Sequence, residues 1–564
     1  MTKQHPFEQF LDTFVPIIAR KSKQLNKVTW ILETTGSPDA VDLRADLDTE
    51  LRLLCSDVAT YEKLIAWDRD PAIQDPLLKR QLNVLIRTFK QNLVPKELLQ
   101  EIAQAEAKLA QSYSQFRAEV GGKRLSENDI REILKRELDP AKRKEAWEAS
   151  KQIGVVLAPQ ILSLVVLRNE AAKALDYSEY FSLQLHLQEV DEKWLAQTLD
   201  DLTRRSDAAY NGMLCTLERE LAKKYRVSIE ELGPWAWNDP FCQEDPLDAG
   251  DLDELVKEMN ISDANIAFYD RMGFDVKSIL ARSDMEERPG KNQHAFCMHI
   301  DRNGDIRTLN NVRPSMQWLE TVLHELGHSV YELGLEQSLP WLLREPPHMI
   351  PTEAMALFAG RQAYRYDALS ILMGASQKNE ALMRKGEESL RRRQLIFSRW
   401  VLAMTAFERE LYKRPNQDLN ALWWEMVAKY QRIRMPNHRQ HAHDWATKYH
   451  IGLAPVYYFS YLLGEMFAST MEEQLLQFTG SQHVASEKSG QFLREKLFSP
   501  GNRMSWSSLI EHVTGKPLNA DAWIRQFAVD HEYNGPKNVD QCLNSDPPKK
   551  EEARNGQNKK TIFP

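Results

Sequence analysis

The segment "QWLETVLHELGHSVYELG", residues 317–334, has the residue spacing of one amphipathic helix. At about 100° per residue, its aliphatic side chains fall on a single stripe. That stripe consists of Leu319, Val322, Leu323, Leu326, Val330 and Leu333. His324 and His328 then lie together on the opposite face, one turn apart, with Glu325 beside them. We therefore expect a helix with a buried apolar side and a polar side that carries two imidazoles.

Two imidazoles one helical turn apart can bind a single metal ion, and a neighbouring glutamate can hold the attacking water. The alternative is a polar face that is merely solvated, because Glu320 and Glu332 also lie on it. A catalytic zinc ion requires a third protein ligand and one position left open. The motif therefore predicts a zinc site only if a third ligand can be found.

Glu353, in "PPHMIPTEAMALFAG", stands 25 residues after His328 and is one candidate for the third ligand. It follows Pro351-Thr352, a helix-start signal, and the helix dipole favours a carboxylate in the first turn. On spacing alone, it could equally be an ordinary first-turn glutamate. His348, 20 residues after His328, stands at another known ligand spacing, but two prolines precede it and indicate a loop histidine.

The composition is that of a globular protein, with 42% hydrophobic and 27% charged residues among 564. The formal net charge of -8 offers no basic excess to phosphates, so we expect no nucleic acid partner. The five cysteines are scattered and form no CxxC pair, which indicates a reducing compartment.

The N-terminal segment has Glu8 and Asp12 inside its apolar pattern, so it does not resemble a signal peptide. No run of 18 uncharged apolar residues occurs, so we expect no transmembrane helix and no membrane partner. These features together predict a cytoplasmic protein.

The chain reads as successive helices over residues 9–226 and as a dense turn cluster over 231–254. A hairpin signal, Asn303-Gly304, lies between two short apolar runs. We predict an N-terminal helical domain at 1–200, a second domain carrying the motif at 201–535, and a polar, disordered tail at 536–564.

Three segments resemble the M3 family of zinc metallopeptidases, in particular its oligoendopeptidase F-like branch. They are "HELGHS" with its glutamate 25 residues later, "KNQHAFC" at 291–297, and "HIGLAPVYYFSYLLGE" at 450–465. Ser460 stands where that branch usually has aspartate. The resemblance covers roughly residues 235–465. "WLLREPPHMIPTEA", 341–354, is also similar to the angiotensin-converting enzyme family, which shares the same fold.

The resemblance implies a mainly α, elongated, all-helical gluzincin peptidase with a deep substrate channel and a small β-sheet beside the active-site helix. It implies one zinc ion with His324, His328 and Glu353 as its ligands, and Glu325 as the general base. It also implies His450 and Tyr458 as oxyanion donors, with Tyr457 as the alternative tyrosine.

The expected function is hydrolysis of internal peptide bonds in short unfolded peptides by a zinc-dependent oligoendopeptidase. A strand near Ala295 would bind the peptide main chain by adding it to the sheet. Two alternatives stay open: a carboxydipeptidase of the angiotensin-converting enzyme type, and a helical peptide-binding protein without catalysis.

Overall fold

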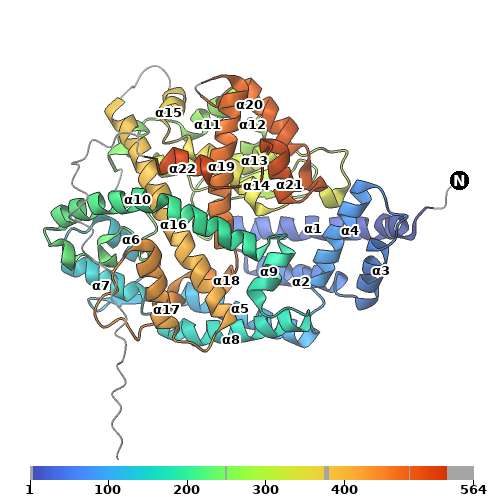
Figure 1. Ribbon diagram of the computed structural model, residues 1–564, viewed down its shortest axis with the longest axis horizontal. Helices are drawn as coiled ribbons and strands as arrows, with labels where there is room; N and C mark the ends of the chain where they lie inside the picture. The colour runs from blue at the N-terminus through green and yellow to red at the C-terminus, as the bar shows by residue number, and fades with distance from the viewer. Residues whose placement is uncertain (1–3, 248–249, 374–379, 482, 530–564) are drawn as a thin grey trace, which may run out of the picture.

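The computed structural model describes residues 4–247, 250–373, 380–481 and 483–529. The predicted tail at 536–564 lies outside these residues. Figure 1 shows a body built mainly of helices, and the strands among the described residues form two small sheets. The expected mainly helical fold is confirmed.

The helices of the N-terminal half are α1 Pro6–Thr35, α2 Pro38–Leu54, α3 Val58–Asp68, α4 Pro76–Lys90, α5 Lys96–Gln115, α6 Glu127–Arg136, α7 Pro140–Ser150, α8 Gly154–Ala174, α9 Tyr180–Leu187, α10 Glu192–Tyr225, α11 Ile261–Arg271 and α12 Lys277–Leu280. Those of the C-terminal half are α13 Met316–Leu333, α14 Met349–Arg361, α15 Tyr366–Leu372, α16 Glu380–Lys413, α17 Leu419–Met426, α18 Tyr449–Leu453, α19 Tyr458–Thr479, α20 Glu487–Phe492, α21 Trp506–Thr514 and α22 Asp521–Phe527.

Each of the two sheets is an antiparallel pair. β3 (Phe296–His299) pairs with β4 (Ile306–Leu309), and the turn between them contains Gly304 at φ +97°, so the predicted hairpin is confirmed. β1 (Ala118–Val120) and β2 (Lys123–Leu125) interrupt a stretch that we expected to be helical. Their two-residue turn, Gly121-Gly122, has positive φ at both positions, which suits a tight hairpin and breaks a helix.

The predicted boundary between residues 200 and 201 lies inside α10, which runs from the left edge of the molecule to its middle in Figure 1. Leu199 and Leu202, on either side of that point, belong to one hydrophobic core that extends from Leu109 to Phe527. The main chain is therefore helical through this position, and both sides of it are buried in the same core.

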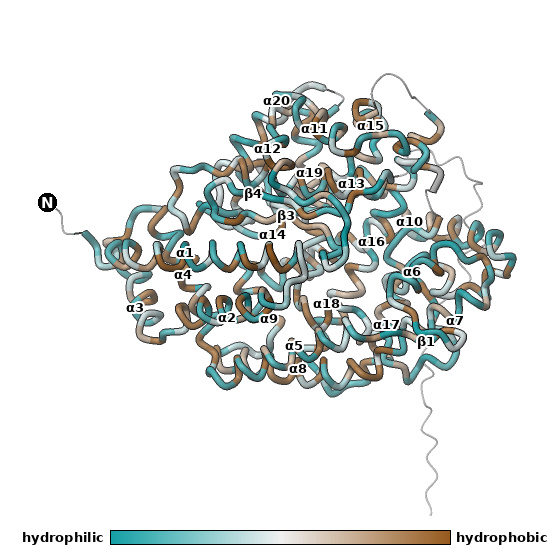
Figure 2. The backbone as a smooth tube through the Cα atoms, turned by 180° about the vertical axis from the view of Figure 1, so that it is seen from behind, coloured by the Kyte–Doolittle hydropathy of each residue, from teal (hydrophilic) through white to brown (hydrophobic). Residues whose placement is uncertain are grey.

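A second, smaller core holds α1 to α4 together around Phe7, Leu64, Leu82 and Phe89. In Figure 2, α1 alternates between hydrophilic and hydrophobic turns, as expected for a helix that buries one face. Near its other end, α1 places Trp30 against the β3–β4 hairpin, where the Trp30 and Phe296 ring centroids lie 6.1 Å apart. The N-terminal helices are thereby packed against the sheet that lies beside α13.

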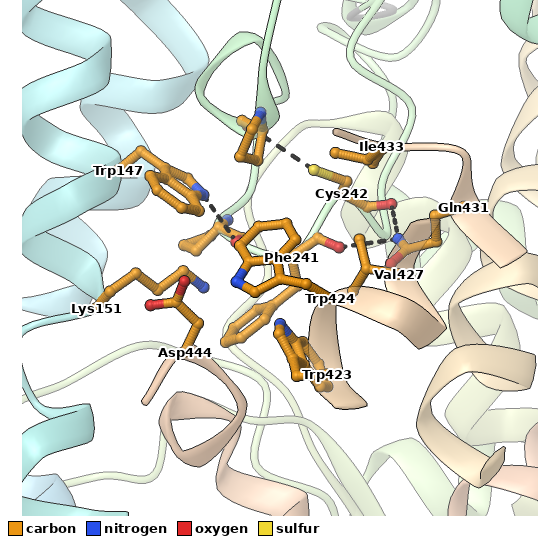
Figure 3. Close-up of a pocket in the computed structure, with 12 residues that line it drawn as sticks. Trp147, Lys151, Phe241, Cys242, Trp423, Trp424, Val427, Gln431, Ile433 and Asp444 are labelled. Atoms are coloured by element: carbon orange, nitrogen blue, oxygen red, sulfur yellow. Dashed lines mark hydrogen bonds between the residues drawn. The ribbon is translucent and has the colours of Figure 1, made fainter. Parts of the chain in front are cut away.

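Figure 3 shows an aromatic pocket where the turn cluster after α10 meets α7 and α17. Trp147, Phe241, Trp423 and Trp424 line it, and the Lys151 ammonium lies 3.8 Å from the Phe241 ring centroid. Burial lowers the pKa of Lys151 to about 8. No residue of the histidine motif lines this pocket, so it belongs to the packing of these elements and not to the motif.

The segment Pro140–Ala174 is long and apolar enough to cross a membrane by length and composition, although we expected no such segment. Of its most apolar window, 44% is buried inside the protein, and buried core helices pass the same test. The segment is therefore weak evidence for a membrane span. It is also divided in two, because α7 ends at Ser150 and α8 begins at Gly154.

Three helices at the centre of the molecule pack in sequence, α13 on α14 and α14 on α19. A Cβ atom built on Gly327 of α13 would lie 2.7 Å from Ala356 Cα and 3.0 Å from Met355 O of α14. A Cβ atom on Gly464 of α19 would lie 3.3 Å from Glu353 Cβ. The glycines allow the backbones to approach closely, and this approach brings α14 against the histidine face of α13.

We expect Gly327→Ala to destabilise the protein by about 1–3 kcal/mol, because its methyl group would meet backbone atoms that cannot move aside. Urea denaturation of the metal-free protein measures this change. Gly212→Ala is the matched control: Gly212 lies within α10, and its Cβ would meet nothing within 4 Å. That control should be neutral or stabilising by up to about 1 kcal/mol. Equal stabilities of the two variants would contradict the role of the close approach.

Candidate metal centre and active site

α13 presents its motif as the sequence predicts. It begins at Met316, and the side chain of the preceding Ser315 accepts a hydrogen bond from the Trp318 amide. Its inner stripe is buried, apart from Leu333. The His324 and His328 side chains lie on the opposite face and stay 25% and 14% exposed. A ligand can therefore reach the imidazoles, while the aliphatic stripe holds the helix in the core.

α14 begins immediately after His348, and this histidine caps the helix. His348 Nδ1 accepts a hydrogen bond from the Ile350 amide at 3.0 Å, and His348 Nε2 lies 3.2 Å from Gln188 Oε1. Both ring nitrogens are thus engaged in holding the start of α14. Glu353, in the same helix, faces α13 instead.

The structure brings His324, His328 and Glu353 together, with ligand atoms all within 4.8 Å of one another. Glu353 Oε2 lies 3.7 Å from His324 Nε2 and 3.9 Å from His328 Nε2. This oxygen is buried and has no hydrogen-bond partner among the described residues. Burying a carboxylate oxygen without a partner is costly, and a cation between the three groups would remove that cost.

The protonation states at the cluster suit a cation. Burial lowers the pKa of His324 to about 4, and burial together with His324 lowers that of His328 well below its usual value, so both rings are neutral. A neutral imidazole is the form that binds a metal. Burial raises the pKa of Glu353 to about 7, and burial together with Glu353 raises that of Glu325 to about 8.

Two imidazoles and one carboxylate are a donor set that zinc prefers in catalytic sites, with a fourth position left for water or substrate. The orphaned Glu353 oxygen and the neutral rings fit that set. Glu325, between the two histidines in sequence, is 6% exposed and lies near Glu353. The arrangement therefore has three candidate ligands and one further carboxylate that can exchange a proton.

Two models of known families match different halves of the chain. The model described as angiotensin-converting enzyme, peptidase family M2, matches residues 1–235, and the model described as peptidase family M3 matches residues 280–529. The chain is a zinc metallopeptidase of the M2/M3 group. The M3 match contains α13, α14, α18 and α19, and every candidate site residue of the metallopeptidase lies within residues 280–529.

The two neighbouring tyrosines of the metallopeptidase have different surroundings. Tyr457, immediately before α19, donates its hydroxyl to Glu353 Oε1 at 3.2 Å. Tyr458 is 4% exposed, and its ring packs against Trp400 and His450 at centroid distances of 5.9 and 4.7 Å. Successive residues at a helix start point in different directions. The structure therefore shows Tyr457 at Glu353 and Tyr458 packed in the core, and which of the two donates to an oxyanion stays a prediction.

His450 lies on α18, where its ring contacts Tyr449 and Tyr458. Its Nδ1 is buried and has no hydrogen-bond partner among the described residues. Burial, the Lys448 charge and His294 lower the pKa of His450 to about 3, so the ring is neutral. The role of His450 as an oxyanion donor stays a prediction.

Tyr461, which the sequence analysis did not select, packs beside Tyr457. Its ring centroid lies 5.0 Å from that of Tyr457, one helical turn earlier. Its ring also packs against that of Tyr458, at a centroid distance of 5.7 Å. Burial raises the pKa of Tyr461, and the Glu353 carboxylate raises it further. The four-residue spacing of Tyr457 and Tyr461 was the available signal, because such residues share one helix face.

Proposed function

We propose that this metallopeptidase is an oligoendopeptidase that cleaves internal bonds of short unfolded peptides with one zinc ion. His324, His328 and Glu353 would hold the ion. The M3 match over residues 280–529, which include all three of these residues, supports this proposal.

The observation that carries the proposal is the position of β3. Among the described residues, β3 pairs with β4 along one edge only, and β3 packs on α13. Cys297 Sγ lies 3.3 Å from Ser329 Oγ, and Ser329 directly follows His328. A strand edge without a partner strand can bind peptide main chain whatever its sequence, and such binding requires no peptide terminus. This supports cleavage at internal bonds.

A bound zinc ion would supply a Lewis acid that polarises the scissile carbonyl and acidifies water. In the proposed mechanism, a Glu325 carboxylate oxygen takes a proton from the attacking water and gives it to the leaving nitrogen. In this mechanism the Tyr457 hydroxyl would donate to the oxyanion that develops on the substrate, and Tyr461 packs beside it. β3 orients the peptide main chain during these steps.

The test is mass spectrometry of a mixed peptide library, with free and with blocked ends, digested with and without a zinc chelator. We expect internal cleavage of blocked peptides, which stops with the chelator and returns when zinc is added. The control protein carries Glu325→Gln. Zinc binding without cleavage of any peptide would instead support a peptide-binding protein that lacks catalysis.

The M2 match over residues 1–235 favours a second candidate, a carboxydipeptidase of the angiotensin-converting enzyme type. Such an enzyme must bind the C-terminal carboxylate of its substrate. The same digests separate the two candidates, because a carboxydipeptidase releases only C-terminal dipeptides and leaves amidated peptides intact. That result would overturn the endopeptidase proposal and keep the zinc site.

We propose the cytoplasm as the place of action. Cys55, Cys242 and Cys297 are free thiols, which supports a reducing compartment. Cell fractionation with an antibody against the chain tests this, and recovery outside the cytoplasmic fraction would contradict it.

We expect Tyr457→Phe to lower kcat by about 100-fold, because one donor to the oxyanion is lost. Tyr458→Phe is the matched control, since it removes the hydroxyl of the neighbouring, core-packed ring. This control should change stability by about 1 kcal/mol and leave kcat close to that of the wild type. Steady-state kinetics on a fluorogenic peptide, with thermal melts, measure both. A slow Tyr458→Phe variant beside a normal Tyr457→Phe variant would contradict the assignment.

A further inference from the structure

Two consecutive residues of α14 contact the two nitrogens of one imidazole. Thr352 Oγ1 lies 2.8 Å from His328 Nδ1, and Glu353 Oε2 lies 3.9 Å from His328 Nε2. Thr352 is 6% exposed, so water does not readily replace its hydroxyl. The first turn of α14 therefore lies against both nitrogen atoms of the His328 ring.

A neutral imidazole carries one N–H, and the nitrogen that binds a metal must be the one without it. If His328 Nε2 is the metal-binding atom, Nδ1 carries the proton and requires an acceptor. Thr352 Oγ1 is at hydrogen-bond distance from that atom. We propose that Thr352 is a positioning residue that holds His328 in its metal-binding tautomer and orientation; this inference rests on the proposed zinc site.

The surroundings of Thr352 keep its hydroxyl in place. The His348 cap fixes the start of α14, and the close approach of α14 to α13 at Gly327 fixes the distance between the helices. Thr352 therefore presents Oγ1 to His328 from a rigid support.

The other histidine has no equivalent support. Among the described residues, no hydrogen bond is made by the His324 ring, and its Cβ lies against Gly360, where a built Cβ would be 3.5 Å away. Because a single threonine orients a single ligand, removing its hydroxyl should weaken metal binding without removing any metal-coordinating atom.

A hydroxyl differs from a carboxylate in this position because it can donate as well as accept. In the metal-free protein it can pair with either tautomer of His328, and metal binding selects the one in which Nδ1–H donates to Oγ1. Valine keeps the branched shape of threonine but pairs with neither tautomer, whereas serine keeps the hydroxyl. The two substitutions separate hydrogen bonding from packing.

The experiment measures the zinc Kd of Thr352→Val, Thr352→Ser and wild type by competition with a chromophoric chelator, and the melting temperature of each metal-free protein. Thr470→Val is the control: Thr470 is 4% exposed on α19 and donates to Met466 O at 3.0 Å, away from the cluster. We expect Thr352→Val to weaken zinc binding by about 10- to 100-fold. Thr352→Ser and Thr470→Val should bind zinc as the wild type does.

An unchanged Kd in Thr352→Val, with a wild type that binds zinc, would overturn the inference and leave the proposed function standing. An equal loss in Thr352→Ser and Thr352→Val would also overturn it, because the hydroxyl would then not be the cause. Should Thr352→Val lower the melting temperature, recovery of the wild-type Kd in Thr352→Ser still supports the inference. A wild type that binds no zinc overturns both proposals.

Discussion

Glu325→Gln should yield a protein that still binds one zinc ion but hydrolyses peptides about 10²- to 10⁴-fold more slowly than the wild type. Glutamine has nearly the same shape as glutamate, so the helix and the ligands beside it stay in place. Its amide, however, cannot take a proton from water at neutral pH. The loss should therefore lie in kcat, with KM and zinc content little changed.

The measurement is steady-state kinetics on one fluorogenic peptide, together with metal analysis of the same preparation. Glu336→Gln, the same substitution just beyond the end of α13, is the matched control and should keep full turnover. Near-normal turnover of Glu325→Gln would show that another group takes the proton. Loss of zinc from Glu325→Gln would show that this carboxylate is itself a ligand.

Glu353→Ala should lose stoichiometric zinc and, with it, peptide hydrolysis. It removes the only carboxylate of the three-residue cluster and leaves two imidazoles, which is one protein ligand fewer than catalytic zinc sites use. His348→Ala is the matched control because it lies in the same helix start and stood as the other possible ligand. It should keep zinc and cost about 1 kcal/mol of stability, as the loss of a helix cap does.

Zinc analysis after dialysis, and urea denaturation of the metal-free proteins, measure the two effects separately. The result that would reverse the ligand assignment is retention of zinc by Glu353→Ala together with its loss from His348→Ala. His324→Ala and His328→Ala extend the series, and each should lose zinc as Glu353→Ala does.

The local sequence does not show which tyrosines lie at the site and which lie in the core. "PVYYFSY" places three tyrosines within five residues, and each of them suits either a core or a site. Whether each tyrosine lies at the site or in the core depends on where α19 starts and on the residue that each one contacts. Tyr457 contacts Glu353, and Tyr458 contacts Trp400. These neighbours come from α14 and α16, more than fifty residues away in sequence.

The sequence by itself determined the features that depend on near neighbours along the chain. The stripe of α13 and the pairing of His324 with His328 follow from the period of the α-helix, and the β3–β4 hairpin follows from its Asn303-Gly304 turn. The same reasoning missed the β1–β2 hairpin, although Gly121-Gly122 carried a comparable signal.

Only the tertiary structure decided between Glu353 and His348, because both spacings were open along the chain. The packing of α14 on α13 turns Glu353 toward the histidines, while His348 is used to cap α14. The role proposed for Thr352 also depends on tertiary structure. A threonine hydroxyl belongs to no metal-binding sequence motif, and only the packing of α14 on α13 shows that it lies beside the His328 imidazole. Periodicity determines which side of a helix a residue occupies, and packing determines what lies opposite.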